Sequence, residues 1–530
     1  MSDTVVKQAA HPEVNTATGP RSVAVIDIGA TAIRMAIAEI HQNGEVRTLD
    51  QLVQPVQLGQ EAFETRRLSR KSIERVASVL TQYQRVLHEY GIDRTADVRV
   101  VATSAVREAS NRLAFADRVF TVTGLHVEPI DEAEVNRITY MGITPQLLAH
   151  PDLADGKAMV LEIGGGSTEA LVVRSGNVLA SHSYRLGSLR MLQAVDMARA
   201  GVERERALME NHINRTLTQL GDLLRSESKL NLVAVGGDIR LATRLLVDDW
   251  QSGELAILKT SDLTRLTDSV IQLADDEIVK RYGASFVEAQ TMGPALLAYS
   301  MIAKHFNIDK LYVSDTNLRD GLLKDIALGG SWTAEFRNQI VRSALSLGRR
   351  FHFDEMHARS VAELSRKLFD QLRNEHKLDT RHEVILYVAA LLHEIGIQIN
   401  VRSHHKHALY IIKNSELFGL SQSELLQVGL VARYYRRAAP QPTHTEYMSL
   451  DRDTRVMVGK LAAILRLATA LDDTRTSRIR EIECLIDHKR MIIQVPGVRD
   501  VSLEQIAMKQ QALLFRDVYG LSVILRAGER

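Results

Sequence analysis

The sequence predicts an α/β protein with two similar lobes, followed by a helical region and a small α+β segment. Two observations predict the lobes: a unit of strands around a glycine-containing loop occurs twice, and helical patterns flank each copy. A third observation, apolar residues at three- and four-residue spacing after Ala334, predicts the helical region. With 530 residues the chain is too long for one hydrophobic core, so about two to four domains are expected.

The first copy of the unit begins with an apolar, β-branched run from Val23 to Ile28. The loop Gly29-Ala30-Thr31-Ala32 follows, and strand character resumes from Arg34 to Ile40. Asn43-Gly44 favours a tight hairpin turn into a third strand, Val46 to Leu52.

The second copy repeats this order. An apolar run from Ala158 to Ile163 leads into Gly164-Gly165-Gly166-Ser167-Thr168, and a strand follows from Glu169 to Val173. Ser175-Gly176-Asn177 forms the turn into Val178 to Ser183. Two copies predict two related lobes whose loops face each other across a cleft, although strand–turn–strand patterns also recur by chance in α/β proteins.

Helical patterns from Lys71 to Tyr90 and from Val202 to Ser226 predict that helices cover a mixed sheet in each lobe. Gly329-Gly330-Ser331 breaks the pattern and indicates a linker. The expected division is a disordered tail (1–20), lobe I (21–150), lobe II (151–330, its last helix returning to lobe I), a helical domain (331–480) and a small α+β segment (481–530).

The helical domain shows its period in Val361, Leu364, Leu368 and Leu372. Beyond it, mixed patterns return. They predict a hairpin, a helix and a final strand, over Ile482 to Ile486, Met491 to Val495, Leu503 to Val518 and Ser522 to Leu525.

Composition excludes several function classes. The 66 basic and 65 acidic residues nearly balance, so affinity for a polyanion must come from a local cleft rather than from bulk charge. Cys484 is the only cysteine, which excludes intrachain disulfides and cysteine-based metal sites and fits a reducing compartment. No apolar run reaches the ~18 residues of a membrane span, and the first twenty residues lack a signal-peptide pattern. We therefore expect a cytoplasmic protein.

The loop from Gly164 to Thr168 is the strongest candidate for anion binding. Glycine accepts the dihedrals that turn backbone N–H groups toward an anion, and Ser167 and Thr168 add hydroxyl donors. Glu162 and Glu169 bracket the loop with oxygen ligands of the kind that magnesium requires. A glycine-rich turn alone is often only a turn, but the flanking carboxylates and the matching first loop favour phosphate binding.

Three further segments fit the same architecture. Gly236-Gly237 follows a strand and opens a helix, whose N-terminus favours an anion, and Ser314 to Gly321 also lies at a strand-to-helix junction. Thr103 and Ser104 offer hydroxyl groups, and Arg107 offers a guanidinium suited to bidentate phosphate contact. Without the surrounding loops, Arg107 would be interpreted as a solvated helix residue.

Taken together, these motifs resemble, in order and spacing, the exopolyphosphatase/guanosine pentaphosphatase (Ppx/GppA) phosphatases over roughly Ser22 to Pro440. The segments that carry the resemblance are Asp27-Ile28-Gly29 with Arg34, Ala102 to Arg107 with Asn111, Gly164 to Glu169, Arg185 to Arg190, and Ser314 to Gly321. The resemblance implies an actin/Hsp70-like (ribonuclease H-like) duplicated fold. It also implies Mg²⁺-assisted hydrolysis of the terminal phosphoanhydride of polyphosphate or guanosine pentaphosphate.

The resemblance also implies roles for individual residues. The expected magnesium ligands are Asp27, Glu162 and Glu169. The expected phosphate-binding residues are Gly29, Thr31, Arg34, Thr103, Ser104, Arg107, Gly164, Gly165, Gly166, Ser167, Thr168, Gly236 and Gly237. The expected partners are polyphosphate or a guanosine polyphosphate and a second copy of the chain in a homodimer, with no membrane and no specific nucleic acid.

The chain departs from the family pattern at several positions. Ala30 and Ala32 replace serines of the first loop, Glu162 replaces an aspartate, and Asp238 replaces a threonine. Val135 stands where family members carry the glutamate that acts as general base, and Glu134 and Glu132 are the nearest candidate substitutes. Since a general base typically contributes ~10²–10⁴-fold, its loss predicts a slow enzyme. A catalytically impaired binding or regulatory protein is the alternative.

The helical domain resembles the HD phosphohydrolases. His357, His393-Glu394 and Asp472 occur in the order that those enzymes use for metal, with Glu394 in place of the usual aspartate. A second metal, with residual phosphohydrolase activity, is therefore a third hypothesis. Lys406, Arg433, Arg436 and Arg437 form a candidate cationic face for a long polyanion, or else a solvated helix surface, and His404, His405 and His407 lie nearby in sequence.

Overall fold

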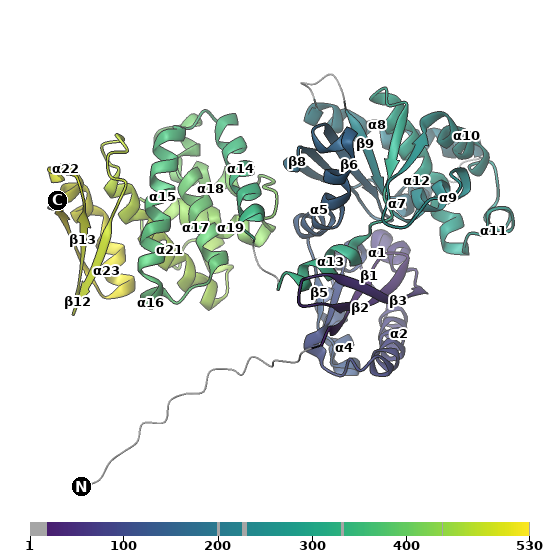
Figure 1. The fold of residues 1–530 in the computed structure, drawn as a ribbon, viewed down its shortest axis with the longest axis horizontal. Coiled ribbons are helices and arrows are strands. Elements are labelled where there is room, and N and C mark those ends of the chain that lie inside the picture. The colour runs from purple at the N-terminus through teal and green to yellow at the C-terminus, as the bar shows by residue number, and fades with distance from the viewer. Residues whose placement is uncertain (1–18, 199–201, 225–229, 330–332, 437, 529–530) are drawn as a thin grey trace, which may run out of the picture. The chain divides into compact units, whose positions relative to one another are not determined.

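The structure is a computed structural model that describes residues 19–198, 202–224, 230–329, 333–436 and 438–528 (Figure 1). Residues 1–18 of the predicted tail, Gly330 and Ser331 of the predicted linker, the end of the helical pattern at Ser226, and Arg437 lie outside the described residues. The chain forms two compact units. One unit comprises Met1–Pro129 and Leu318–Gly330, and the other comprises Ile130–Asn317 and Ser331–Arg530.

The first unit is built on one five-stranded sheet of order β3-β2-β1-β4-β5. Its strands are β1 (Arg21–Ile28), β2 (Ala32–Ile40), β3 (Val46–Pro55), β4 (Val98–Ala102) and β5 (Val127–Pro129). Its helices are α1 (Leu58–Thr65), α2 (Arg70–Glu89), α3 (Ser104–Glu108), α4 (Arg112–Thr123) and α13 (Leu318–Ala327). Helix α2 packs on α4 and β2, whereas α13 packs on β1 and β2 (Figure 1).

The second unit begins with lobe II, whose six-stranded sheet has the order β10-β11-β9-β6-β7-β8. Its strands are β6 (Lys157–Ile163), β7 (Thr168–Arg174), β8 (Asn177–Tyr184), β9 (Asn231–Val235), β10 (Ala256–Lys259) and β11 (Lys310–Val313). Its helices are α5 (Glu132–Ala149), α6 (Pro151–Ala154), α7 (Ser188–Ala198), α8 (Val202–Leu224), α9 (Gly237–Leu246), α10 (Thr260–Val270), α11 (Asp275–Tyr282) and α12 (Phe286–His305).

The predicted repeat is confirmed by the topology of the two sheets. Lobe I has the order β3-β2-β1-β4-β5, and lobe II repeats it as β8-β7-β6-β9-β11 with β10 added at the edge. In both, three antiparallel strands are followed by a parallel neighbour. The register shifts at Ile37/Ala38 in one lobe and at Val172/Val173 in the other. The loop after the first strand of each repeat therefore has an equivalent place in its own lobe.

The first boundary between the units falls after Pro129, ahead of the boundary at residue 150 expected from sequence. Helix α5 packs on α6, β7 and β8, so it belongs to lobe II. The hydroxyl of Tyr140 in this helix donates to the carbonyl of Gly176 in the β7–β8 turn at 2.6 Å. The helical domain belongs to the same unit as lobe II.

The helical domain buries the predicted apolar stripe. Val361, Leu364, Leu368 and Leu372 are all at most 2% exposed. The helices are α14 (Ala334–Arg350), α15 (Glu355–Gln371), α16 (Arg373–His376), α17 (Thr380–Leu392), α18 (His404–Lys413), α19 (Gln422–Tyr434), α20 (Thr445–Met448) and α21 (Arg452–Leu471). Helix α15 packs on both α17 and α21, which sets the places of the histidines discussed below.

The C-terminal segment contains the sheet β12-β13-β14, with strands at Glu483–Asp487, Arg490–Val495 and Ser522–Ala527. The prediction of one helix from Leu503 to Val518 is wrong, because the chain forms α22 (Ser502–Gln511) and α23 (Leu513–Tyr519). The break lets both short helices pack on α21 and on β14, burying Met508 and Phe515. Among the described residues, no helix combines the length and the apolar character needed to span a bilayer.

Candidate active site

The loop after β6 presents backbone donors on a rigid support. The N–H groups of Ser188 and Leu189 donate to the carbonyls of Gly164 and Gly165 at 2.9 and 3.0 Å, so the start of α7 fixes the position of the loop. Arg190 Nε donates to the carbonyl of Gly166 at 2.6 Å. Within the part of the chain that the structure describes, the N–H groups of Gly165 and Gly166 have no acceptor, which leaves them available to an anion.

Gly187 fixes how closely α7 approaches this loop. A Cβ added to Gly187 would lie 2.3 Å from the carbonyl oxygen of Gly165 and 2.6 Å from the carbonyl carbon of Gly166. These atoms belong to the backbone of the loop, so a side chain at position 187 would have to displace the loop itself. The absence of a side chain at Gly187 is therefore a condition for the observed loop geometry.

Two carboxylates face each other beside the loop. Glu162 and Glu169 are paired across β6 and β7, so their side chains leave the same face of the sheet. Glu169 is 5% exposed, and its Oε1 accepts hydrogen bonds from the hydroxyls of Ser167 and Ser183 at 2.7 and 3.3 Å. Like charges directly opposite each other destabilise a sheet unless a cation lies between them, so this pair fits a magnesium site.

Thr168 has a different role from the one predicted. Its side chain is fully buried, and its hydroxyl donates to the carbonyl of Leu186. This hydrogen bond ties the loop to the chain before α7, and the hydroxyl has no further proton to donate to an anion. The prediction that the Thr168 hydroxyl donates to phosphate is therefore wrong, because this hydroxyl supports the loop instead.

Tyr299 is a supporting residue that sequence reasoning missed. Its hydroxyl accepts a hydrogen bond from Ile163 N at 2.9 Å and donates to the carbonyl of Val235 at 2.5 Å. Ile163 and Val235 end β6 and β9, so one buried hydroxyl from α12 joins the bases of two glycine loops. Burial is the main cause that raises the pKa of Tyr299 well above its usual value, which keeps the hydroxyl protonated.

The second glycine turn has the backbone that only glycine adopts readily. Gly236, the N-cap of α9, has φ +130°, and a Cβ there would lie 3.3 Å from the Tyr299 hydroxyl. Arg240 Nη1 donates to the carbonyls of Asp315 and Thr316 at 3.3 and 3.1 Å, which connects this helix to the loop after β11. Gly236 and Gly237 thus open the helix as predicted.

Lobe I places a buried carboxylate at the end of β1. Asp27 is 8% exposed, and its Oδ1 has no hydrogen-bond partner in the described chain. Burial raises the pKa of Asp27, an effect opposed by the charges of Arg34 and Arg319. Arg319 Nη1 lies 3.9 Å from Asp27 Oδ2. A buried oxygen without a partner fits a metal ligand, and Arg319 is a charge partner that the sequence analysis did not assign.

The remaining predicted phosphate residues of lobe I lie around the same strand ends. Arg34 faces Asp27 across β1 and β2, and its Nη2 donates to Thr31 Oγ1 at 3.4 Å. Thr103 N donates to the carbonyl of Ile28 at 3.2 Å, which places α3, with Ser104 and Arg107, next to the loop of Gly29. The convergence of these groups with the Gly164 loop and Glu169 of the other unit stays a prediction.

Helix α5 presents Glu134 to a basic neighbour. Arg137 donates from Nε and Nη2 to the two carboxylate oxygens of Glu134, each at 2.7 Å. Asp131, the N-cap of the helix, accepts from Glu134 N at 2.9 Å. Val135 is 7% exposed, whereas Glu132 is half-buried. Arg137 therefore engages both carboxylate oxygens of Glu134, which leaves Glu134 poorly placed to accept a proton from water.

The helical domain brings its predicted metal residues together. His357, His393 and Glu394 each offer one ligand atom, and these three atoms lie within 4.8 Å of one another. His393 Nδ1 donates to the carbonyl of Ala390 at 2.7 Å, and its buried Nε2 has no partner among the described residues. Burial lowers the pKa of His393 to about 4, so the ring is neutral near pH 7.

Asp472 orients the imidazole ring of His357 in this cluster. Its Oδ2 lies 2.8 Å from His357 Nδ1, and its Oδ1 accepts from Ser477 N at 2.8 Å. Both carboxylate oxygens of Asp472 are therefore engaged, and Nε2 is the ring nitrogen of His357 that is left for a metal. Asp472, predicted as a ligand, thus lies where an outer carboxylate fixes a ligating imidazole. Arg475 Nη2 lies 2.6 Å from Glu394 Oε1 at the edge of the cluster.

The predicted cationic face of the helical domain is partly neutralised. Arg433 Nη1 lies 3.7 Å from Glu446 Oε2. His405, whose pKa is lowered to about 4 mainly by burial, lies close enough to His404, Lys406, Arg436 and Arg433 to be affected by their charges. His404 is instead occupied on both ring nitrogens: Nδ1 donates to the carbonyl of Val401 at 2.9 Å, and Nε2 accepts from the hydroxyl of Tyr435.

A comparison with known proteins decides the family. The model of the Ppx/GppA phosphatase family matches residues 36–329, and the model of its domain III matches residues 341–516. The chain belongs to the Ppx/GppA phosphatase family. As a member of this family it is a hydrolase, and its helical region corresponds to the family's third domain.

Named relatives share about a quarter of their residues with this Ppx/GppA chain. A guanosine-5'-triphosphate,3'-diphosphate pyrophosphatase from Aliivibrio fischeri is 24% identical over 450 residues, covering 83% of this chain and 86% of the relative. The protein of the same name from Photobacterium profundum is 23% identical over 526 residues, covering 96% and 98%. An exopolyphosphatase structure from Cytophaga hutchinsonii, at 21% identity and TM-score 0.52, covers 58% of this chain and 98% of that one and supports the fold.

Proposed function

We propose that this Ppx/GppA protein removes the terminal phosphate of inorganic polyphosphate or guanosine pentaphosphate by magnesium-assisted attack of water. The observation that carries the proposal is the Gly164 loop, whose free N–H groups lie beside the facing pair Glu162 and Glu169. The names of its relatives, a guanosine-5'-triphosphate,3'-diphosphate pyrophosphatase and an exopolyphosphatase, support this substrate class. When bound at these carboxylates, Mg²⁺ would neutralise charge on the phosphoryl oxygens.

The chain's own residues divide the remaining work. The N–H groups of Gly165 and Gly166 bind phosphoryl oxygens, and Ser167 is held by Glu169 next to them. In lobe I, Arg107 supplies the guanidinium for a bidentate phosphate contact. Because Val135 cannot accept a proton from water, we expect slow turnover, and a protein that binds these ligands without hydrolysing them is the alternative.

The proposal is tested by phosphate release from purified protein with magnesium, using polyphosphate and guanosine pentaphosphate separately. We expect release from at least one substrate, its loss on chelation of magnesium, and a kcat about 100-fold lower for Glu169→Gln. Glu254→Gln changes an exposed glutamate of the same lobe and serves as the matched control. Binding without release would favour the regulatory alternative, and neither binding nor release would overturn the assignment.

We further propose a transition-metal site in the helical domain, whose HD-like character is also part of this proposal. It is favoured by the trio of His357, His393 and Glu394 and by the unpartnered Nε2 of His393. Two imidazoles and one carboxylate suit zinc, manganese, iron or cobalt. This proposal is independent of the phosphate site proposed at the Gly164 loop. The homodimer expected from the sequence stays a prediction.

Cobalt binding provides the test of the helical-domain site. When metal-free protein is titrated with Co²⁺, we expect a visible absorption band that saturates at one equivalent per chain. His393→Ala should weaken cobalt binding at least about 100-fold. His488→Ala removes a histidine that is 95% exposed in its side chain and should change nothing. An unchanged band in His393→Ala would show that cobalt binds elsewhere and would end this proposal.

A further inference from the structure

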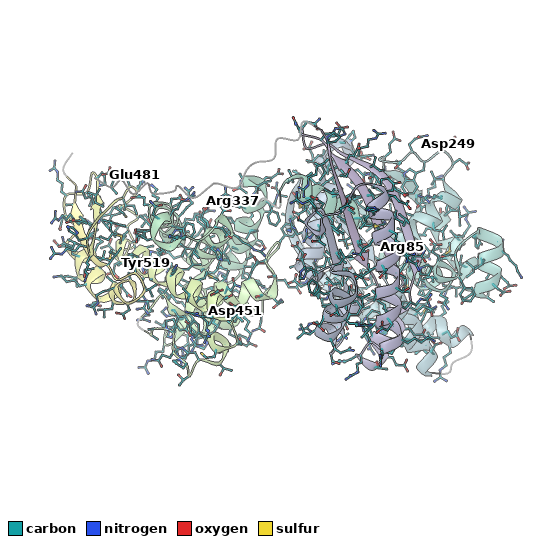
Figure 2. All side chains as sticks on the ribbon, turned by 90° about the horizontal axis from the view of Figure 1, so that it is seen from below. Arg85, Asp249, Arg337, Asp451, Glu481 and Tyr519 are labelled. Atoms are coloured by element: carbon teal, nitrogen blue, oxygen red, sulfur yellow. The ribbon has the colours of Figure 1, made fainter. Side chains whose placement is uncertain are left out.

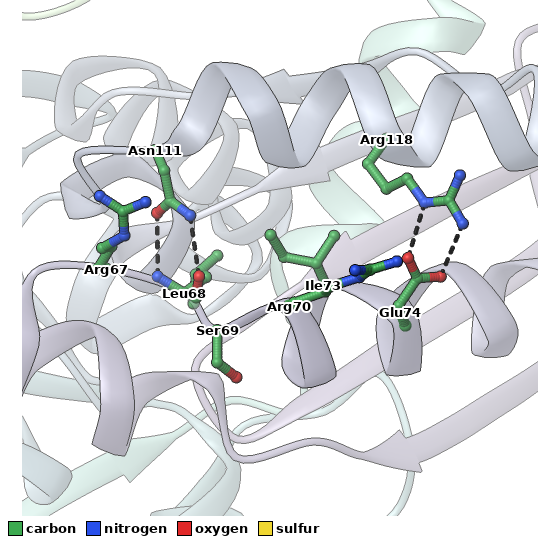
Figure 3. A pocket seen from close by; sticks show the side chains of 8 residues that line it. All are labelled: Arg67, Leu68, Ser69, Arg70, Ile73, Glu74, Asn111 and Arg118. Carbon is green, nitrogen blue, oxygen red and sulfur yellow. Dashed lines mark hydrogen bonds and ion pairs between the residues drawn. The ribbon is translucent and has the colours of Figure 1, made fainter.

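A hollow lined by arginines lies on lobe I, between the start of α2 and the facing α4 (Figure 3). It has a volume of about 520 Å³. Arg67, Arg70 and Arg118 line it with one carboxylate, Glu74. Figure 3 shows Arg67 at one end, Arg118 bound to Glu74 at the other, and Arg70 between them. Three guanidinium groups around one hollow indicate a site for an anion.

The backbone of this hollow is held without help from the arginine side chains. Asn111 accepts from Leu68 N at 3.0 Å and donates to the Leu68 carbonyl at 2.9 Å, so its side-chain amide clamps the segment before α2. Ser110 N donates to the carbonyl of Arg66 at 2.8 Å, and Leu68 is 2% exposed. The guanidinium groups of Arg67 and Arg70 are therefore carried on a fixed backbone and remain available to a ligand.

The charge of the hollow is not balanced from within. Glu74 uses both carboxylate oxygens for Arg118, at 2.9 and 3.0 Å, and the hydrogen bond from Arg118 is the first cause that lowers the pKa of Glu74. No described residue accepts a hydrogen bond or forms an ion pair with the side chain of Arg67 or Arg70. An anion with several negative charges would complete the set.

The hollow is continuous in the chain with the predicted phosphate residues of lobe I. Arg107 lies in the last turn of α3, and only three residues separate it from Asn111, so their Cα atoms are at most about 14 Å apart. Arg112, the first residue of α4, donates from Nη1 to the carbonyl of Arg107 at 3.4 Å. Ser110 N donates to the carbonyl of Arg66, so the loop after Arg107 lies against the segment that carries Arg67, and a linear polyanion held at Arg107 would extend along it.

The lining also indicates which part of a ligand is bound. No aromatic side chain lines the hollow, and its polar groups are guanidinium, amide and hydroxyl groups and the carboxylate of Glu74, which is paired with Arg118. A nucleobase is usually bound by stacking, whereas a phosphate chain needs only donors and positive charge. The observations therefore favour phosphate groups over a guanosine moiety.

We propose that this hollow is a distal subsite that binds the inner phosphates of a long polyphosphate chain whose end lies at Arg107. The inference rests on the proposed function and deepens it, because the subsite assigns long-chain polyphosphate as the preferred substrate. A second contact on the same chain raises the effective concentration of the reacting end, so it acts through substrate binding and depends on chain length.

The test compares long-chain polyphosphate with tripolyphosphate in the full-length protein. For Arg67→Gln/Arg70→Gln we expect the ratio of KM for the long chain to KM for tripolyphosphate to rise about tenfold, with kcat for the long chain retained. Arg47→Gln/Arg85→Gln removes two exposed arginines of the same lobe that do not line the hollow (Arg85 is labelled in Figure 2), and it should leave the ratio unchanged.

Direct binding separates this inference from the proposed hydrolysis. If the wild-type protein releases no phosphate, the same variants are compared by titration with both polyphosphates, and selective weakening for the long chain would support the subsite alone. An equal change for both lengths, or no change, would overturn the subsite whether or not the protein is a hydrolase. If free phosphate binds more tightly than the long chain, and salt weakens that binding, the hollow holds an adventitious ion only, and the proposal is contradicted.

Discussion

Replacing Gly187 with alanine is expected to lower phosphate release by at least about 100-fold while the chain stays folded. The added Cβ would lie 2.3 Å from the carbonyl oxygen of Gly165, a separation that no pair of non-bonded atoms can keep. Because Leu186 and Met191 bury the start of α7 in the core of lobe II, and α7 packs on α8 and α12, the Gly164 loop is the part that must move. A shift of about 1 Å misplaces the N–H groups of Gly165 and Gly166.

The measurement is phosphate release with magnesium, together with the thermal unfolding midpoint of each variant. Gly221→Ala is the matched control, since no atom lies within 4 Å of a Cβ added at Gly221, and alanine is the better residue within a helix. Arg190→Gln removes the donor to the Gly166 carbonyl without adding bulk and should cause a smaller loss. Full activity in Gly187→Ala would show that the loop geometry is not needed for catalysis, and substrate binding provides the same comparison if wild-type turnover is too slow.

The sequence predicts the lobes well because their evidence is local. The strands of the repeat span at most ten residues and are joined by short turns, and two copies in the same order predict the same sheet. The pairing of Glu162 with Glu169 follows from the same pattern, since a short loop joins two antiparallel neighbours. The sequence pattern therefore predicts which loops form the site and which side chains lie at the ends of those loops.

Supporting contacts could not be predicted, because they join residues far apart in the chain. Tyr299 lies within an apolar helical run and has no local signal, yet its hydroxyl connects the ends of β6 and β9. Arg319 approaches Asp27 from a helix almost three hundred residues later in the chain. The boundary at Pro129 has the same cause: α5 looks like the last helix of lobe I, and only its packing on β7 and β8 assigns it to lobe II.

Introducing glutamate at Val135 is expected to raise kcat for phosphate release by about 10²–10⁴-fold, with KM changed little. The family resemblance predicts that Val135 stands where relatives carry the general base, and Val135 lies in the first turns of α5, which Asp131 caps. A carboxylate near a helix N-terminus is favoured by the helix dipole, which partly offsets the cost of placing charge at a site that is 7% exposed. The measurement is steady-state release from the better substrate.

Two variants test whether the carboxylate added at position 135 raises kcat by accepting a proton. Val135→Gln matches the size and polarity of glutamate but cannot take a proton at neutral pH, so it should not raise kcat. Glu134→Gln breaks the ion pair with Arg137 and should leave phosphate release within a few-fold of wild type, because that carboxylate is already held at both oxygens. If Glu134→Gln instead abolishes a strong wild-type activity while Val135→Glu does nothing, Glu134 is the base. The helix would then have to turn Glu134 away from Arg137 when substrate binds.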